Sequence, residues 1–217
     1  MIPRVITEFS TRRILTMTYL DGYRLSDVFG EQADLKLRTW VARKYYRLVW
    51  RQILEFGVLH TDPQPGNYLV TYHPRLGILD FGSVRRFPEP VRRASLQMAQ
   101  AMLAGDDRGV AAALLKLGYL DRGQDPAPLV KVMYVLFEPV LINRIYHPAE
   151  YNAVAKVAEV GELAFQHKLY KSPRHSIFLL RALIGLDGIM KGLAVKTNYC
   201  TLFRKCIDDA ARANRAR

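Results

Sequence analysis

The feature that most constrains this chain is a polar loop bounded by apolar runs and followed by a second acidic motif. The loop has the sequence HTDPQPGN over residues 60–67, and DFG occupies residues 80–82. Kinase-type phosphoryl transfer uses one carboxylate to orient or deprotonate the acceptor hydroxyl. An amide oxygen and a second carboxylate then hold magnesium on the ATP phosphates. A lone DFG triplet is a weak signal, whereas Asp62, Asn67 and Asp80 in this order and spacing favour that chemistry.

Short apolar runs flank both motifs. They occupy residues 58–59, 68–70 and 78–79, and we expect each to form a strand. Residues 72–75 are typical of a turn. Asp62 and Asn67 would then lie on a loop between strands, and Asp80 would lie at the end of the next strand. Magnesium is commonly bound by few protein oxygens together with phosphate and water oxygens, so Asn67 and Asp80 are sufficient as ligands. A solvated turn capped by Asp and Asn is the alternative, but it leaves Asp80 unexplained.

Pro63, directly after the first aspartate, and the PGN ending of the loop resemble the AarF/UbiB family of atypical kinase-like proteins. The similarity begins at IPRV (2–5), continues through STRRILTM (10–17), and extends past Asp80 into LAGD (103–106). It covers about the first 120 residues well and the remainder more loosely. The resemblance implies a protein-kinase-like fold, ATP and magnesium as cofactors, and a link to ubiquinone or other isoprenoid-lipid metabolism at membranes.

The resemblance also assigns roles to individual residues. Asp62 becomes the catalytic-loop aspartate, and Asn67 and Asp80 become the magnesium ligands. The segment from Thr18 to Leu20 becomes a hinge that meets adenine through backbone groups. A plain strand-to-helix connection is an equal alternative for that segment.

Two features depart from the family pattern. Gln64 stands where the family usually has His; it can hydrogen-bond a phosphate or an acceptor, but it carries neither a proton nor a positive charge. The sequence also lacks a phosphate-covering loop, an ATP-binding Lys with its helix Glu, and the family's Lys-x-Gly-Gln extension. We therefore expect the chain to begin inside the last strands of the small lobe. His60 is expected to brace the loop rather than to shuttle protons.

The expected fold is α+β and mainly helical: a protein-kinase-like large lobe with a remnant of the small lobe's last strands. Residues 1–30 would be the end of the small lobe and the hinge, 31–120 the catalytic core, and 121–217 the helical C-terminal part of the same lobe. Half of the 217 residues are hydrophobic, enough for one substantial core. Periodicity predicts helices over 37–56 ending at Gly57, 88–103, 107–117, 138–168 with interruptions at Pro139 and Pro148, 174–195 and 201–217. If the chain has a flexible boundary between two parts, we expect it at residues 121–128.

The net charge of +12 is concentrated near the C-terminus, where residues 167–217 hold eleven Lys or Arg against three Asp. Three interpretations of this basic segment stay open. It could be the solvated face of a buried helix, a surface for peripheral contact with an anionic membrane, or a nucleic-acid-binding surface. The sequence contains no recognised nucleic-acid-binding motif that would support the third. Charges interrupt the apolar segment 176–195, which falls short of the ~18 uncharged residues of a spanning helix. We expect a cytoplasmic protein, with peripheral attachment to the inner membrane as an option.

Two functional hypotheses follow. The first is an ATP- and magnesium-using lobe of the AarF/UbiB type, a phosphotransferase or ATPase, inactive until completed by a small lobe encoded upstream or supplied by another chain. The second is a nucleotide-independent, pseudokinase-like module that docks on membrane or protein through a basic helical face. A split aminoglycoside-type phosphotransferase is a third option, which Pro63 disfavours.

Overall fold

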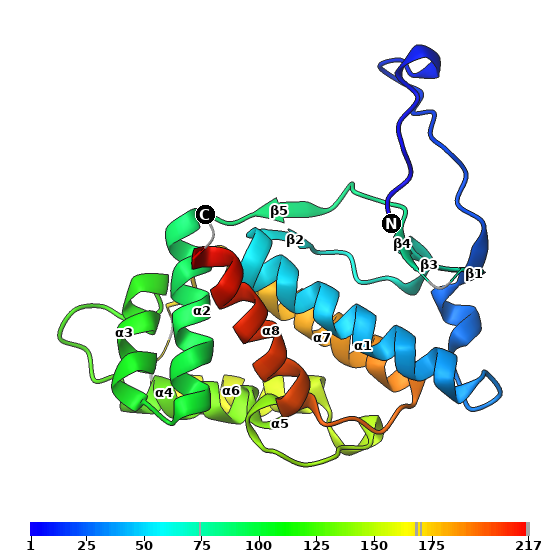
Figure 1. The fold of residues 1–217 in the computed structure, drawn as a ribbon. Coiled ribbons are helices and arrows are strands. Elements are labelled where there is room, and N and C mark those ends of the chain that lie inside the picture. The colour runs from blue at the N-terminus through cyan, green and yellow to red at the C-terminus, as the bar shows by residue number, and fades with distance from the viewer. Residues whose placement is uncertain (74, 168, 170, 216–217) are drawn as a thin grey trace.

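The computed structural model describes residues 1–73, 75–167, 169 and 171–215, and it is mainly helical with small sheets (Figure 1). Within these ranges there are eight α-helices: α1 (Leu35–Arg51), α2 (Glu89–Ala104), α3 (Asp107–Leu117), α4 (Ala127–Leu136), α5 (Glu138–Leu141), α6 (Ala153–Gln166), α7 (Ser176–Leu193) and α8 (Tyr199–Arg215). The strands are β1 (Gly22–Arg24), β2 (Val58–His60), β3 (Tyr68–Thr71), β4 (Leu76–Ile78) and β5 (Val84–Arg86). The predicted mainly helical α+β class is confirmed.

Helix α1 leads into the polar loop. It begins at a cap in which the Asp34 carboxylate accepts a hydrogen bond of 2.8 Å from the Leu37 amide. The helix continues as a π-helical turn over Gln52–Phe56 and stops at Gly57, whose φ is 63°. This left-handed conformation favours glycine, because a Cβ would crowd the following carbonyl. The helix expected over 37–56 and its end at Gly57 are therefore both present.

The strands form two small antiparallel sheets. One has the order β1-β3-β4, with Tyr23 opposite Val70 and Tyr68 opposite Ile78. The other pairs β2 with β5, and places Leu59 opposite Arg85. Strands β2 and β3 are consecutive in the chain but belong to different sheets, so the loop between them spans the gap. Strand β4 ends two residues before Asp80.

Two hydrophobic clusters hold the helices together. In the larger one, α1 packs against α7 and α8 (Figure 1). Its buried members include Tyr45, Trp50, Leu186, Leu193 and Phe203. The second cluster joins α2, α3 and α4 through Met102, Val110, Leu114, Val130 and Met133. In the part of the chain that the structure describes, no helix is both long and apolar enough to span a bilayer.

Helix α7 approaches the polar loop closely because Gly185 faces Pro63. A Cβ atom at Gly185 would overlap the Pro63 ring. About two turns later, a Cβ at Gly192 would come within 2.6 Å of the Phe29 ring. Gly188, between them, has nothing within 4 Å of its Cβ position. The two crowded glycines therefore set how near α7 lies to the loop and to the segment before α1.

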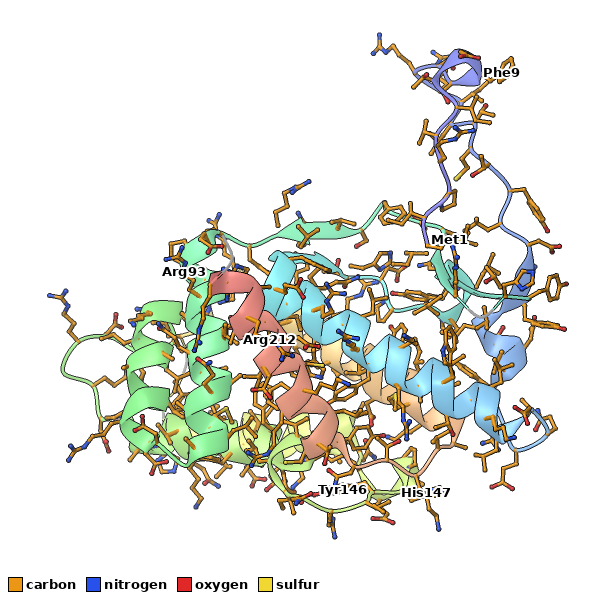
Figure 2. All side chains as sticks on the ribbon, in the orientation of Figure 1. Met1, Phe9, Arg93, Tyr146, His147 and Arg212 are labelled. Atoms are coloured by element: carbon orange, nitrogen blue, oxygen red, sulfur yellow. The ribbon has the colours of Figure 1, made fainter. Side chains whose placement is uncertain are left out.

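Residues 1–20 form an arm that extends away from the helical body (Figures 1 and 2). Val5 pairs with Met17 across the arm. At the base, the Ile78 amide donates to the Met1 carbonyl at 3.0 Å, which joins the arm to β4. Figure 2 shows Phe9 at the far tip. Many apolar side chains of the arm are exposed: Ile2, Val5, Phe9, Ile14, Leu15, Met17 and Tyr19.

The segment expected to be a soft boundary leads directly into a helix that was not predicted. Helix α4 begins at Ala127, with Pro126 before it and Pro128 in its first turn. Prolines signal loops, but the first turn of a helix tolerates them because its amides have no intrahelical acceptor. The expected turn over residues 72–75 is closed by the Thr71 amide, which donates to the Arg75 carbonyl at 3.1 Å. Pro74 of that turn lies outside the described residues.

The helix predicted over residues 138–168, with interruptions at Pro139 and Pro148, is confirmed only in part. Helix α5 ends at Leu141, and residues 142–152 hold only a short 3-10 turn. Pro139 starts α5 instead of interrupting a longer helix, again because a first-turn proline loses no hydrogen bond. Helix α6 starts anew after Asn152, whose side chain accepts from the amides of Val154 and Ala155. Lys168 and residues 216–217, where two predicted helices end, lie outside the described residues.

Gly185→Ala should destabilise the protein relative to Gly188→Ala. Alanine raises helix propensity by about 1 kcal/mol at either position. Only at Gly185 does the added methyl group overlap Pro63, and such overpacking costs roughly 1–3 kcal/mol. Urea unfolding of the two variants measures the difference, and equal free energies of unfolding would contradict the close approach of α7 to the loop.

Candidate functional site

The polar loop holds a carboxylate between an amide and a guanidinium group. Asp62 Oδ2 accepts a hydrogen bond from Asn67 Nδ2 at 2.8 Å. Asp62 Oδ1 accepts from Arg181 Nη2 at 3.0 Å. Asn67 Nδ2 also donates to the Asp62 carbonyl at 3.2 Å, which closes the loop on itself. The five-residue spacing in the sequence therefore brings these two side chains into direct contact.

The segment that carries Asp80 is hydrogen-bonded to this loop on both sides of the aspartate. On one side, the Leu79 amide donates to the Asn67 carbonyl at 2.9 Å. On the other side, the Thr61 amide donates to the Ser83 carbonyl at 2.8 Å. The Thr61 and Ser83 hydroxyls are also 2.8 Å apart. The structure thus places Asp80 beside the loop that carries Asp62 and Asn67.

His60 links three parts of the structure to one another through hydrogen bonds. Its side chain is buried, and Nε2 lies 2.6 Å from the Asp80 carbonyl. A carbonyl only accepts, so Nε2 carries the proton and Nδ1 is left to accept from the Asp62 amide at 3.4 Å. The His60 amide donates to Gln52 Oε1 at 3.1 Å, at the end of α1. These contacts are the bracing arrangement that the sequence predicts for His60.

Asn67 and Asp80 provide oxygen atoms suited to a divalent cation. The Asn67 amide nitrogen is engaged by Asp62, which leaves its oxygen for a ligand. Asp80 Oδ1 accepts from the Gly82 amide at 2.7 Å, and Oδ2 is the second carboxylate oxygen. One amide and one carboxylate oxygen fit magnesium, which completes its coordination with phosphate and water. Among the described residues, no group of three or more His, Cys, Asp or Glu side chains is arranged to hold a metal.

The three residues assigned to cofactor binding lie in two places. Gln64 is exposed on the loop, and its carbonyl accepts from the Asn67 amide at 3.0 Å. Thr18 and Leu20 lie at the base of the arm. The Leu20 side chain lies against Gly77 of β4, the strand that leads into Asp80. The hinge candidate is thereby next to the strand that leads to Asp80.

Thr18 is already engaged within the arm. Its amide donates to the Arg4 carbonyl at 2.9 Å, and its hydroxyl oxygen accepts from the Arg4 amide at 2.9 Å. An adenine ring would therefore meet other backbone groups of the 18–20 segment.

Sequence reasoning missed Arg181, which it treated only as a charged interruption of an apolar helix. Arg181 lies one helical turn before Gly185, so the close approach of α7 brings its guanidinium to Asp62. Its side chain is 57% exposed, and that of Asp62 is 30% exposed. Exposed ion pairs contribute little to the free energy of unfolding. The contact between Arg181 and Asp62 therefore orients the Asp62 carboxylate more than it stabilises the fold. No local pattern could have revealed it, because the partners are 119 residues apart.

A protein-family model covers the part of the chain that contains the polar loop and the Asp80 segment. A family model described as the ABC1 atypical kinase-like domain matches residues 1–114 of this chain. The matched range is more than half of the 217 residues, and it contains the arm, the polar loop and the Asp80 segment. Arg181 lies beyond it.

Similar curated proteins match most of this chain but extend well beyond it. Protein ACTIVITY OF BC1 COMPLEX KINASE 3, chloroplastic, from Arabidopsis thaliana is 28% identical over 190 residues, which cover 87% of this chain and 26% of that protein. AarF domain-containing protein kinase 1 from Xenopus laevis is 26% identical over 232 residues, which cover 97% of this chain and 42% of that protein. The chain therefore spans less than half the length of either relative.

A solved structure shares the fold. The complex of Rv3197 with erythromycin from Mycobacterium tuberculosis superposes with a TM-score of 0.68 at 17% sequence identity. The match covers 96% of this chain and 52% of that chain. The likeness of fold therefore extends to the helices after residue 120.

His60→Ala should destabilise the protein, whereas His73→Ala should not. Removing the buried His60 imidazole takes the donor from the partly buried Asp80 carbonyl, and loss of such a hydrogen bond typically costs about 0.5–1.5 kcal/mol. His73 is exposed at the end of β3, where substitutions usually change stability by within about 0.5 kcal/mol. Urea unfolding of both variants tests the bracing role, and an unchanged free energy of unfolding in His60→Ala would contradict it.

Proposed function

We propose that this chain, which belongs to the ABC1 family of atypical kinase-like domains, forms the large lobe of an ATP- and magnesium-dependent phosphotransferase or ATPase. The hydrogen bonds that join Asp62, Asn67 and the Asp80 segment carry the proposal. Kinase-type chemistry needs one carboxylate for the acceptor and two oxygen ligands for magnesium, all close together. A loop that only caps local structure would not need to be tied to a second acidic motif.

Asp62 is the proposed catalytic residue. Its carboxylate would orient or deprotonate the attacking hydroxyl, whether that of a metabolite, a protein or water. Arg181 and Asn67 hold the two carboxylate oxygens, so the group is fixed before the acceptor arrives. Removing a general base of this kind lowers turnover roughly 10² to 10⁴-fold.

Asn67 and Asp80 are the proposed magnesium ligands. Bound magnesium would neutralise negative charge on the ATP phosphates. Gln64, exposed on the same loop, would hydrogen-bond a phosphate or the acceptor. Thr18 to Leu20 would form the hinge beside adenine, supported by the contact of Leu20 with Gly77.

A small lobe is the proposed partner, encoded in the same protein or supplied by another chain, and without it we expect this chain to be inactive. The arm supports this part of the proposal, because it exposes several apolar side chains, among them Ile2, Phe9, Ile14 and Leu15. Exposed apolar surface of this kind marks interaction sites. Residues 1–30 would then be the end of the small lobe and the hinge, 31–120 the catalytic core, and 121–217 the helical remainder of the large lobe.

The proposed setting is isoprenoid-lipid metabolism, ubiquinone included, at the cytoplasmic face of the inner membrane. This part follows from family resemblance and from the net charge of +12. Each Lys or Arg near an anionic membrane surface contributes roughly 1 kcal/mol to binding.

Calorimetric titration of MgATP and MgADP into the purified chain tests the proposal. We expect weak binding that requires magnesium and is lost in Asp80→Asn, because the variant removes the carboxylate charge that faces the cation. Asp208→Asn is the matched control, since Asp208 is an exposed carboxylate on α8. It should bind like the unmodified chain.

Absence of binding up to millimolar nucleotide, or equal binding by Asp80→Asn, would contradict the proposal. Absence of binding would favour a nucleotide-independent, pseudokinase-like module that docks through its basic helical face, whereas equal binding by Asp80→Asn would mean that Asp80 does not hold the cation.

A further inference from the structure

A pocket of about 430 Å³, partly open to solvent, lies between the helices, away from the polar loop. Helices α1, α2, α4, α6, α7 and α8 contribute to its walls. Leu180 and Leu183 line it from α7, on the side of that helix opposite Gly185, as the helical repeat requires. Helix α7 therefore separates this cavity from the loop that carries Asp62.

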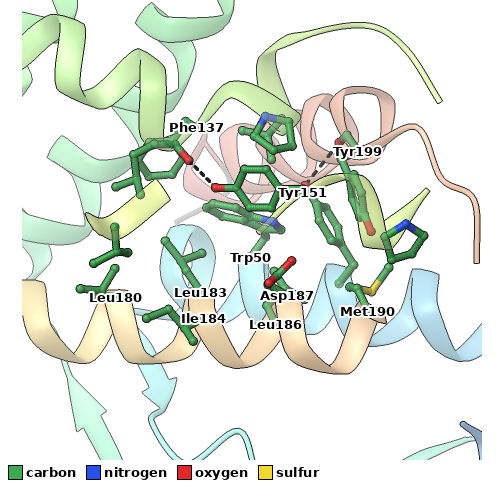
Figure 3. Close-up of a pocket in the computed structure, with 16 residues that line it drawn as sticks. Trp50, Phe137, Tyr151, Leu180, Leu183, Ile184, Leu186, Asp187, Met190 and Tyr199 are labelled. Carbon is green, nitrogen blue, oxygen red and sulfur yellow. Dashed lines mark hydrogen bonds between the residues drawn. The ribbon is translucent and has the colours of Figure 1, made fainter. Parts of the chain in front are cut away.

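A smaller chamber of about 90 Å³ adjoins the cavity (Figure 3). Figure 3 shows Trp50, Phe137, Tyr151 and Leu183 around it, above α7. The two spaces share part of their lining: Trp50, Leu136, Phe137, Val157, Leu180 and Leu183. Trp50 therefore borders both spaces.

The size and lining of the larger cavity are those of a ligand site. Protein interiors are close-packed, with few voids larger than a water molecule. Known ligand pockets occupy roughly 300–1,000 Å³. The walls of the larger cavity are formed mostly by Leu, Met, Val and aromatic side chains, so water inside it would find few hydrogen-bond partners. An apolar occupant fits these walls.

One end of the larger cavity is polar. His175 lines it there, just before α7 begins, and the rings of Phe87 and Tyr119 pack edge-on against the imidazole. The Nε2 atom of His175 is buried and has no hydrogen-bond partner among the described residues. Burial lowers the pKa of His175, which favours the neutral ring. A buried nitrogen without a partner is unfavourable, so a hydrogen-bonding group is required at this point.

We infer that this cavity binds a single-chain amphiphile, with its alkyl chain in the apolar space and a hydroxyl or carboxyl head hydrogen-bonded to His175. Two adjoining apolar spaces that share part of their lining suit a flexible alkyl chain, which can bend from one into the other. The polar group at one end, with apolar walls beyond it, matches the division of such a molecule into head and tail. The site stands apart from Asp62, Asn67 and Asp80, so its ligand binds whether or not the loop uses nucleotide.

Tryptophan fluorescence offers a direct test, because Trp50 lines both chambers and Trp40 is the other tryptophan of the chain. In a Trp40→Phe background, titration with ω-bromododecanoic acid should quench Trp50 emission with saturation at one molecule per chain, since bromine quenches on contact. ω-Bromododecanol is titrated in parallel. Tighter binding of the acid assigns a carboxyl head, and tighter binding of the alcohol assigns a hydroxyl head.

Variants in the same background locate the site. Ala99→Phe fills the cavity from α2, and Val157→Phe fills it from the opposite wall on α6. Each should weaken binding at least about tenfold, a change that corresponds to 1.4 kcal/mol. Ala112→Phe adds the same ring at an exposed position of α3 and should leave binding unchanged. His175→Phe should weaken binding of the preferred probe several-fold.

Absence of saturable quenching would overturn the inference. Unchanged affinity in both Ala99→Phe and Val157→Phe would also overturn it, because the probe would then sit elsewhere. Unchanged affinity in His175→Phe would refute the position of the head group.

Discussion

Helix α7 lies against the polar loop because Gly185 presents no side chain to Pro63, whose ring fills the space that a Cβ would occupy. Pro63 is itself rigid, since its ring fixes φ, so neither partner of this contact yields easily. The approach carries Arg181 to the Asp62 carboxylate. Another face of the helix packs into the interior through residues such as Leu186 and Leu193. One helix thereby joins the hydrophobic core to the chemical groups of the site.

Around that contact, hydrogen bonds fix the geometry of the loop. Asn67 closes the loop onto Asp62, and main-chain bonds on both sides of Asp80 tie its segment to the loop. The buried His60 adds a link from the end of α1 to the Asp80 carbonyl. Charged groups placed this way are oriented before any substrate is bound, which is how preorganised sites lower the barrier to reaction.

Features encoded by neighbouring residues were predictable from the sequence. The helix that ends at Gly57, the loop between two strands and the contact of Asp62 with Asn67 all depend on local spacing and turn chemistry. Helix α4 was not predicted, because its flanking prolines look like loop signals although the first helical turn accepts them. An interruption at Pro148 was predicted, but the full extent of the break over residues 142–152 and the role of Arg181 were missed. Both depend on how distant segments pack, which no periodicity in one sequence reveals.

The central claim is that the loop and the Asp80 segment form one metal–nucleotide site. Paramagnetic broadening of backbone amide resonances by manganese–ADP tests it directly, because the effect falls steeply with distance from the ion. We expect the amide signals of Asn67 and Asp80 to broaden first, while that of Val130 in the second cluster stays sharp. Broadening centred on other residues, or uniform weak broadening of the whole spectrum, would contradict the assignment of Asn67 and Asp80 as metal ligands.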